Sequence, residues 1–597
     1  MPNTAPYGSW KSPITSDLIV SKSIGLGGAF AVGEDIYWIE ARPGEGGRQV
    51  IVRRTSDGAT HDVTPMPFNV RTTVHEYGGR CSVFDGDVVY FSNFADQRLY
   101  RQKIGAEPQP LTPEIAWRYA DPVLDRKRKR LICVREDHTP SDREAVNTLV
   151  AIDLSDGARQ TVLVSDADFY SNPRLSPDGN RLCWLNWNHP NLPWDGTELW
   201  VAPLNPDGSL GKAELVAGSE EESIFQPEWS PDGVLYFVSD RSGWWNLYRW
   251  VSGKTEALQP MEAEFGQPQW QFGMATYGFE SAERMVCVFT HLSRWHLATI
   301  DLATSRMTTL DLPYTYIQSP YAFAGKTLFL GGSPSQPAAI VLFDLASGQS
   351  QVLRRSIEIG LPAGYFSIPQ VIEFPTEHGL TAYANYYPPA NPDYRAPAGE
   401  LPPLLVLSHG GPTSAAPTLF SLNLQYWTSR GFAVVDVNYG GSTGYGRAYR
   451  ERLNGTWGVV DMDDCVNAAR YLAGRGEVDG DRLAIRGGSA GGYTTLCALT
   501  FKDVFKAGAS YFGIGDLEPF VDDTHKFESR YNIRLIGPYP EDKEVYYQRS
   551  PVHFVEEIHT RNGRCTLIRP GHPVHLVPKP QTKEPPREPR PRGCLIR

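Results

Sequence analysis

The 597-residue sequence contains no apolar run that approaches the ~18 residues of a membrane-spanning helix. Its first residues contain neither the basic segment nor the apolar segment of a secretory signal. The net charge is −11, which disfavours nucleic acid as a partner because such proteins gather Lys and Arg on one surface. We therefore expect a soluble, cytoplasmic protein that contacts neither membranes nor nucleic acid.

Cysteine is sparse in a way that excludes two kinds of site. The eight cysteines lie far apart, with no C-x-x-C pair and no histidine at zinc-ligand spacing. We expect reduced, buried thiols, no disulfide, no metal and no cofactor. The apolar content of 41% is typical of globular proteins, and the length of the chain predicts at least two domains.

A repeat runs through the first 360 residues. Short strand-like segments begin at residues 50, 99, 149, 199, 247, 297 and 340. A second pattern, a polar residue followed by proline, is expected to precede a strand at Asp121-Pro122, Asn172-Pro173, Gln226-Pro227 and Gln267-Pro268. A unit of about fifty residues with several short strands is typical of a β-propeller blade. The repeats thus predict an all-β, seven-bladed propeller over residues 21–360, after an N-terminal segment of residues 1–20. A pair of β-sandwiches is the alternative, but it does not predict constant spacing.

From residue 361 onward, strands alternate with helices. This alternation predicts a parallel sheet and an α/β-hydrolase domain over residues 361–560. We expect strands at residues 404–408, 432–437 and 507–512, and helices at residues 420–429, 459–472 and about 524–531.

A G-x-S-x-G motif centred on Ser489 lies between an apolar strand and a small-residue helical pattern. In that context the motif predicts a nucleophile elbow, a strained turn that exposes the serine hydroxyl. Gly487 and Gly491 allow the strand and helix to approach without Cβ clashes. The same motif occurs in ordinary loops, so the flanking elements carry the prediction that Ser489 is a catalytic nucleophile.

An acyl-transfer serine also needs donors aimed at the developing oxyanion. In this fold they are the amide after the nucleophile, here Ala490, and an amide from a loop after an earlier strand. The turn His409-Gly-Gly-Pro412 follows such a strand, and we predict Gly411 as the second donor.

A propeller followed by these motifs, together with the segments at residues 438–446 and 457–461, resembles the prolyl oligopeptidase family of serine peptidases, in particular its acylaminoacyl-peptidase and dipeptidyl-peptidase-like branch. The resemblance extends to about Ile558. It implies hydrolysis of short peptides, or of N-terminal acyl-aminoacyl or dipeptidyl units, in a chamber between the two domains. Tyr511, Phe527 and Tyr531 follow the elbow where the family builds its substrate pocket, although packing in the core also explains them. An esterase is an alternative within the same chemistry, and homo-oligomerisation is left open.

The sequence departs from this pattern near its end. An α/β-hydrolase supplies nucleophile, acid and histidine in that order, but no Asp follows Asp542. Residues 561–597 are rich in Pro, Arg and Lys, so we expect a disordered tail that cannot pack as a strand and leaves the hydrolase domain incomplete. His572 and His575 are expected at the surface rather than in the site. The change of composition near Thr560 indicates a shifted reading frame or an alternative end.

This departure favours a second hypothesis. The chain would be a catalytically impaired or inactive homologue in which the propeller serves as a binding module.

Overall fold

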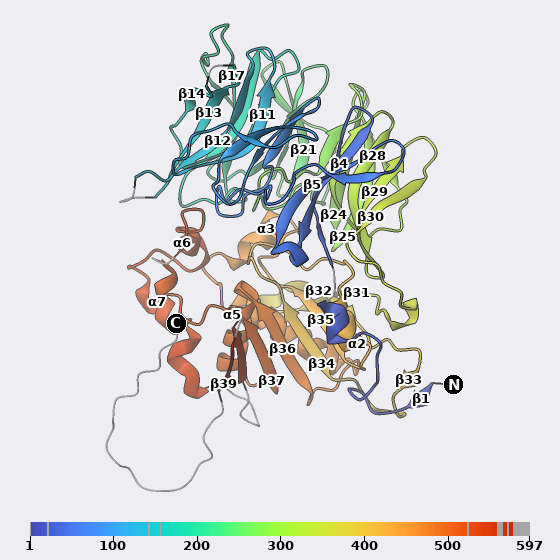
Figure 1. The fold of residues 1–597 in the computed structure, drawn as a ribbon. Helices are drawn as coiled ribbons and strands as arrows, with labels where there is room; N and C mark the ends of the chain where they lie inside the picture. Colours follow the sequence, from blue (N-terminus) through green and yellow to red (C-terminus); the bar gives the residue numbers. More distant parts are fainter. Residues whose placement is uncertain are drawn as a thin grey trace.

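The computed structural model describes residues 2–20, 23–140, 144–155, 157–521, 524–557, 565–569 and 572–576, with side chains up to residue 557. A ring of seven small sheets lies above a domain built on an eight-stranded sheet (Figure 1). The expected seven-bladed propeller followed by an α/β domain is confirmed.

Each blade is an antiparallel sheet made from one continuous segment. Blades one to three contain β2 (Gly25–Leu26), β3 (Phe30–Val32), β4 (Asp35–Arg42), β5 (Arg48–Arg54) and β6 (Thr60–Asp62); β7 (Ser82–Asp85), β8 (Val88–Ser92), β9 (Leu99–Lys103) and β10 (Gln109–Pro110); and β11 (Trp117–Asp125), β12 (Arg130–Asp137), β13 (Val146–Asp153) and β14 (Gln160–Val164).

Blades four to seven follow the same plan. They contain β15 (Phe169–Leu175), β16 (Arg181–Trp187), β17 (Thr197–Pro203) and β18 (Glu214–Ser219); β19 (Ile224–Trp229), β20 (Leu235–Ser239), β21 (Asn246–Val251) and β22 (Lys254–Ala257); β23 (Tyr277–Phe279), β24 (Arg284–His291), β25 (Arg294–Asp301) and β26 (Arg306–Leu310); and β27 (Tyr316–Phe323), β28 (Lys326–Ser333), β29 (Gln336–Asp344) and β30 (Ser350–Arg355). The seven predicted strand segments all fall on the third strand of a blade, counted along its hydrogen-bonded path so that β3, which pairs only with β4, is left out; these strands are β5, β9, β13, β17, β21, β25 and β29.

The polar residue before proline marks a bulge in the first strand of a blade. Asp121, Asn172 and Gln226 have φ near +50°, and the pairing register shifts at each of them. Proline suits the following position because a bulged residue leaves the ladder and needs no N–H partner. Ser319, which precedes Pro320, forms the same bulge in blade seven and escaped the sequence analysis. Gln267-Pro268 was expected to precede a strand in the same way, but it lies in the long loop between β22 and β23.

Apolar packing closes the ring between the first and last blades. Trp38 and Val50 of blade one are fully buried against Leu328 and Ile340 of blade seven. The Arg354 guanidinium also lies 2.8 Å from the buried carboxylate of Glu40. The ring therefore closes without an exchanged strand among the described residues.

The second domain contains a sheet in the order β31-β32-β35-β34-β36-β37-β38-β39. Its strands are β31 (Gln370–Pro375), β32 (Thr381–Tyr387), β34 (Leu404–Ser408), β35 (Ala433–Asn438), β36 (Leu483–Gly488), β37 (Ala507–Tyr511), β38 (Cys565–Arg569) and β39 (His572–Leu576). Neighbours from β35 to β38 are parallel, as the strand-helix alternation predicted.

The helices of this domain are α2 (Leu422–Thr428), α3 (Arg447–Arg450), α4 (Val460–Gly474), α5 (Ala490–Phe501), α6 (Tyr531–Leu535) and α7 (Lys543–Gln548). Short 3-10 helices are η1 (Pro43–Glu45), η2 (Ala363–Tyr365), η3 (Glu377–Gly379), η4 (Glu451–Leu453), η5 (Pro519–Val521) and η6 (Pro551–Glu557). The helix expected near residues 524–531 begins only at Tyr531. The preceding turns instead contact the propeller, where Lys526 Nζ donates to the carbonyls of Ala145 and Asp168. Both α3 and α6 face the propeller (Figure 1).

The prediction that the tail cannot form a strand is wrong for two segments. Strand β38 pairs in parallel with β37, and β39 pairs with β38 in antiparallel. A short run containing Thr566, Leu567 and Ile568 suits a strand, and the open edge of β37 offers unpaired backbone groups. Residues 561–564, 570–571 and 577–597 of the tail, where we expected disorder, lie outside the described residues, as do residues 558–560.

The N-terminal segment packs on the second domain before the chain enters the propeller. Strand β1 (Asn3–Thr4) pairs with β33 (Tyr394–Arg395), and α1 (Ser16–Ile19) follows. The Ser12 and Ser429 hydroxyls are hydrogen-bonded at 2.7 Å. Two segments of the chain, this one and the linker after β30, therefore connect the domains.

Candidate functional site

Ser489 occupies the turn between β36 and α5. Its backbone angles, φ of 54° and ψ of −125°, lie in a region that residues other than glycine rarely adopt, and the residue is exposed. The Ser489 amide donates to the carbonyl of Tyr511, 3.0 Å away, which fixes the turn to the end of β37. This is the strained, exposed geometry of a nucleophile elbow.

Two glycines allow the elbow to pack against β34. A Cβ atom on Gly487 would lie 2.2 Å from the carbonyl oxygen of Gly491, and one on Gly491 would lie 2.1 Å from the oxygen of Ser408. The Ser408 hydroxyl donates to Gly491 O at 2.8 Å. The predicted role of both glycines, close approach of strand and helix, is confirmed by these distances.

Two amides beside Ser489 donate to no acceptor among the described residues. A Cβ atom built on Gly410 would lie 3.5 Å from Ser489 Cβ, so the loop after β34 adjoins the nucleophile. Within the described part of the chain, neither the Gly411 amide nor the Ala490 amide donates a hydrogen bond. Ala490 is also the first residue of α5, where the helix dipole favours negative charge. Both amides are available to a bound oxygen.

The His409 ring anchors this loop. It stacks on Tyr439 with ring centroids 4.2 Å apart. Its Nδ1–H donates to Gly410 O at 2.8 Å, and Nε2 accepts from the Ser442 hydroxyl at 2.7 Å. Burial lowers the pKa of His409 to about 4. A neutral ring with both nitrogens engaged positions the loop and does not accept the proton of Ser489.

Thr413 provides a second anchor for the same loop. The Tyr531 hydroxyl contacts both the amide and the hydroxyl of Thr413. The carbonyl of Thr413 accepts the indole N–H of Trp270 at 2.8 Å. Trp270 belongs to the propeller, so both domains hold the loop.

The structure brings two of the three predicted pocket residues together. Phe527 and Tyr531 are buried at the domain boundary, where both contact Trp194 and Trp270. Tyr511 instead lies beside Arg486, whose guanidinium carbon is 5.4 Å from the centroid of the Tyr511 ring. The Tyr511 ring does not contact the ring of Phe527 or of Tyr531.

Phe512 is a residue at the elbow that the sequence analysis assigned only to a strand. It has a φ of 42°, is 63% exposed, and its ring approaches to 3.2 Å the position of a Cβ atom on Gly488. No sequence signal distinguishes it from an ordinary strand end.

No described side chain is hydrogen-bonded to the Ser489 hydroxyl. In an α/β-hydrolase the acid follows a later strand of the sheet. Here β38 takes the place beside β37, and the sequence after it reads Pro570, Gly571, His572. The side chains of His572 and His575 lie outside the described residues, so their predicted surface position stays a prediction.

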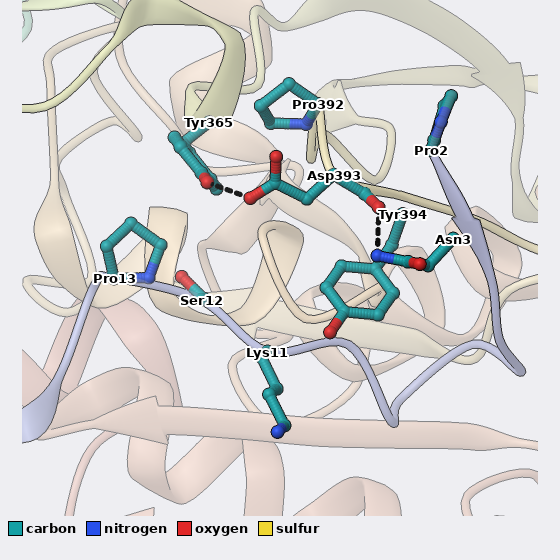
Figure 2. A pocket seen from close by; sticks show the side chains of 9 residues that line it. All are labelled: Pro2, Asn3, Lys11, Ser12, Pro13, Tyr365, Pro392, Asp393 and Tyr394. Atoms are coloured by element: carbon teal, nitrogen blue, oxygen red, sulfur yellow. Dashed lines mark hydrogen bonds between the residues drawn. The ribbon is translucent and has the colours of Figure 1, made fainter.

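A cavity of about 510 Å³ lies elsewhere on the second domain, between the N-terminal segment and residues 392–394. Figure 2 shows the Tyr365 hydroxyl directed at the Asp393 carboxylate, and Asn3 bonded to the Asp393 carbonyl. None of the predicted site residues lines this cavity.

Three other features bear on the sequence predictions. The six cysteines with described side chains are buried and unpaired. Among the residues with described positions, no cluster of three or more metal-ligand side chains occurs. No described helix combines the length and apolarity needed to cross a membrane.

A seven-bladed ring joined to a sheet with a nucleophile elbow defines a propeller-bearing α/β-hydrolase. The model of the prolyl oligopeptidase family matches residues 418–569. A puromycin-hydrolyzing peptidase of Mycobacterium tuberculosis is 40% identical, with a TM-score of 0.89 over 95% of this chain and 88% of that one. Puromycin hydrolase is 38% identical, with a TM-score of 0.88 over 94% and 88% of the two chains. The chain belongs to the prolyl oligopeptidase family, as the motifs predicted.

Curated relatives match over a shorter stretch. Dipeptidyl aminopeptidase BIII of Pseudoxanthomonas mexicana is 39% identical over 175 residues, which are 28% of this chain and 25% of the relative. An acylamino-acid-releasing enzyme of Arabidopsis thaliana is 32% identical over 178 residues, 27% and 22% of the two chains. These matches span about a quarter of each curated relative.

The elbow geometry predicts opposite effects for one substitution at two glycines. Gly491→Ala places a methyl group 2.1 Å from a backbone oxygen and should lower the free energy of unfolding by about 3 kcal/mol or more. Gly474→Ala, at the exposed end of α4 with open space around the new Cβ, should raise it by about 0.5–1 kcal/mol. Urea unfolding of both variants checks this, and equal effects at the two sites would contradict the close approach.

The neutral state of His409 predicts a pH dependence. Its pKa is about 4 in the folded chain against 6.5 for a free histidine, so the unfolded chain binds the proton first as pH falls. The stabilisation is complete above pH 6.5 and is lost toward pH 4, by roughly 1–3 kcal/mol. Unfolding of the wild type and His409→Gln should therefore differ less at the lower pH. A difference that does not change with pH would mean that His409 has the same pKa in the folded and unfolded chains, and would contradict a ring held neutral by burial.

Proposed function

We propose that the chain carries serine peptidase chemistry, in which Ser489 hydrolyses short peptides or releases acyl-aminoacyl or dipeptidyl units from peptide N-termini. The observation that carries the proposal is the exposed, strained Ser489 beside two amides that have no acceptor in the part of the chain that the structure describes. Family membership supports the same chemistry.

In this reaction Ser489 Oγ attacks the carbonyl carbon of the substrate. The carbonyl oxygen gains negative charge, which the amides of Ala490 and Gly411 stabilise by hydrogen bonds. Collapse of the intermediate expels the amine and leaves an acyl group on Ser489, which water then removes. The serine proton must pass to a base and on to the leaving amine. No described side chain is assigned that step.

Phe527 and Tyr531 supply the substrate pocket in this proposal, with Phe512 as an exposed apolar wall at the nucleophile. The names of the relatives indicate the substrates to test first. The relatives are named for hydrolysis of puromycin, for dipeptidyl aminopeptidase activity and for release of acylamino acids, so puromycin, dipeptidyl amides and acyl-aminoacyl amides come first. A serine-to-alanine variant of puromycin hydrolase was solved in complex with PGG. A cytoplasmic location is part of the same proposal.

A second candidate function is a non-catalytic binder built on this peptidase framework. The observation that favours it is that no Asp follows Asp542 in the sequence. Such a chain would keep the pocket and the oxyanion amides but would lack an activated nucleophile.

Turnover by the exact 597-residue chain separates the two candidates. We expect Ser489-dependent hydrolysis of puromycin or of dipeptidyl or acyl-aminoacyl chromogenic amides, several orders of magnitude slower than in an intact triad enzyme. Ser489→Ala should abolish it, whereas Ser347→Ala, at an exposed turn of the propeller, should leave it unchanged. Reaction with a fluorophosphonate should be slow for the same reason.

The other outcomes are also informative. Absence of Ser489-dependent turnover on every substrate would favour the non-catalytic binder. Rapid turnover that is lost in His572→Ala or His575→Ala would assign the base to β39 and contradict the predicted surface position of these histidines.

A further inference from the structure

We propose that Trp270 of the propeller is a positioning residue for the oxyanion loop, residues 409–413, so that docking of the two domains adds an anchor at Thr413 to those that His409 and Tyr531 supply within the hydrolase domain. The inference rests on the proposed function, since it takes Gly411 as an oxyanion donor. It concerns a residue outside the hydrolase domain, to which the sequence motifs assigned no role in the site.

The contacts of Thr413 carry the first step. Its amide and hydroxyl are bonded to the Tyr531 hydroxyl, and its carbonyl accepts the Trp270 indole N–H at 2.8 Å. Thr413 is 5% exposed, so water does not readily replace these partners. Only Pro412 separates Thr413 from Gly411, and the proline ring restricts the backbone between them. A displacement of Thr413 is therefore transmitted to the Gly411 amide.

The position of Trp270 is in turn fixed by aromatic packing. Within the propeller, its ring centroid lies 4.4 Å from that of Trp194 and 5.3 Å from that of Tyr77. In the hydrolase domain, the ring centroids of Phe527 and Tyr531 lie 6.2 and 6.0 Å from it. Rings on several sides restrict the indole to one orientation. The N–H therefore points at the Thr413 carbonyl without a further ordering cost.

The loop that carries Trp270 spans the propeller ring. It leaves β22 of blade five, and its Phe272 amide donates to the Gly78 carbonyl at 2.8 Å. Gly78 and Gly79 belong to the loop that joins blades one and two, and Gly79 also forms a β-bridge with Phe272. Four blades separate these two loops on one side of the ring and three on the other. The position of Trp270 thus depends on the assembled propeller and not on one blade.

The consequence is a link between domain docking and the chemistry of Ser489. When the propeller separates from the hydrolase domain, Thr413 loses its bond to Trp270, and the ring packing that orients Tyr531 is also lost. The Gly411 amide is then free to move away from the oxyanion position. The serine is fully competent only in the docked state.

Hydrogen exchange of the full chain, measured by mass spectrometry on fragments that cover residues 409–416, tests this link without an activity assay. Trp270→Phe keeps an aromatic ring and removes the N–H, and we expect exchange in these fragments to rise about tenfold. The matched control is Trp187→Phe. Trp187 lies in the same aromatic cluster, is 4% exposed, and its indole N–H has no partner in the described structure. This control should leave loop exchange unchanged.

A second pair of variants acts from a distance and protects the test against misfolding of the first variant. A Cβ atom on Gly79 would lie 2.3 Å from Phe272 O, so Gly79→Ala should displace the spanning loop and also raise exchange at residues 409–416. Gly86 also has a positive φ, but a Cβ atom there would meet nothing within 4 Å. Gly86→Ala is therefore the control and should leave exchange at residues 409–416 unchanged.

The inference is overturned if neither Trp270→Phe nor Gly79→Ala raises exchange at residues 409–416 above the level of its control. Where Ser489-dependent turnover is measurable, Trp270→Phe should lower kcat about tenfold with little change in KM, because the bond acts through the oxyanion loop. A rise in KM alone would make Trp270 a substrate contact and would also contradict the inference. Complete absence of turnover in the wild type bears on the proposed peptidase function, whereas the exchange result still decides the role of Trp270.

Discussion

The direct contact between the backbone of α5 and the end of β34 is the constraint on which the site depends. The carbonyl oxygen of Gly491 accepts a hydrogen bond from the Ser408 hydroxyl, and neither Gly487 nor Gly491 has room for a Cβ atom. Strand β36 must therefore reverse into α5 within one residue, and Ser489 takes the strained conformation at that point. The same contact makes Ala490 the first residue of α5, where its amide has no helical acceptor. The exposure of Ser489 and the orientation of the Ala490 amide thus follow from one packing requirement.

The propeller contributes to this site through the side of the ring that faces the hydrolase domain. Arg447 and Arg450 of α3 both donate to the buried Asp240 carboxylate of the propeller, at 2.8 and 2.6 Å. Glu264 accepts the Gly446 amide at 3.0 Å, and burial raises its pKa to about 7. Buried charges of this kind add little net stability but require a specific geometry, because a misaligned partner leaves a charge unpaired. They therefore fix how the propeller docks, which in turn places Trp270 beside Thr413.

Much of this architecture could be predicted from the sequence because it rests on local patterns. The third strand of every blade was predicted from its spacing, and the elbow was predicted from its glycines. Contacts between distant segments leave no such pattern. The contact of Trp270 with Thr413 joins residues 143 positions apart, and the Gln267-Pro268 pair imitates a bulge marker while lying in a loop. Pairing of β38 with β37 was also missed, because an open sheet edge overrides the composition of the segment that joins it.

The parts of the site differ in how they depend on the end of the chain. The proposed oxyanion amides, the loop anchored by His409, and the aromatic residues Phe527 and Tyr531 all lie within residues 409–531, and the loop and both aromatic residues pack against the propeller. Their positions are fixed by contacts with β34, β37, Trp270 and one another, none of which involves a catalytic acid or base. Proton transfer in the proposed peptidase would instead need an acid and a histidine, which an α/β-hydrolase supplies after a later strand, and the sequence after β38 carries no carboxylate before a histidine. Because these contacts do not involve the triad, the proposed pocket keeps its shape whether or not an acid and a base are in place. The proposed slow peptidase and the proposed binder therefore share these residues and differ in whether a side chain accepts the proton of Ser489.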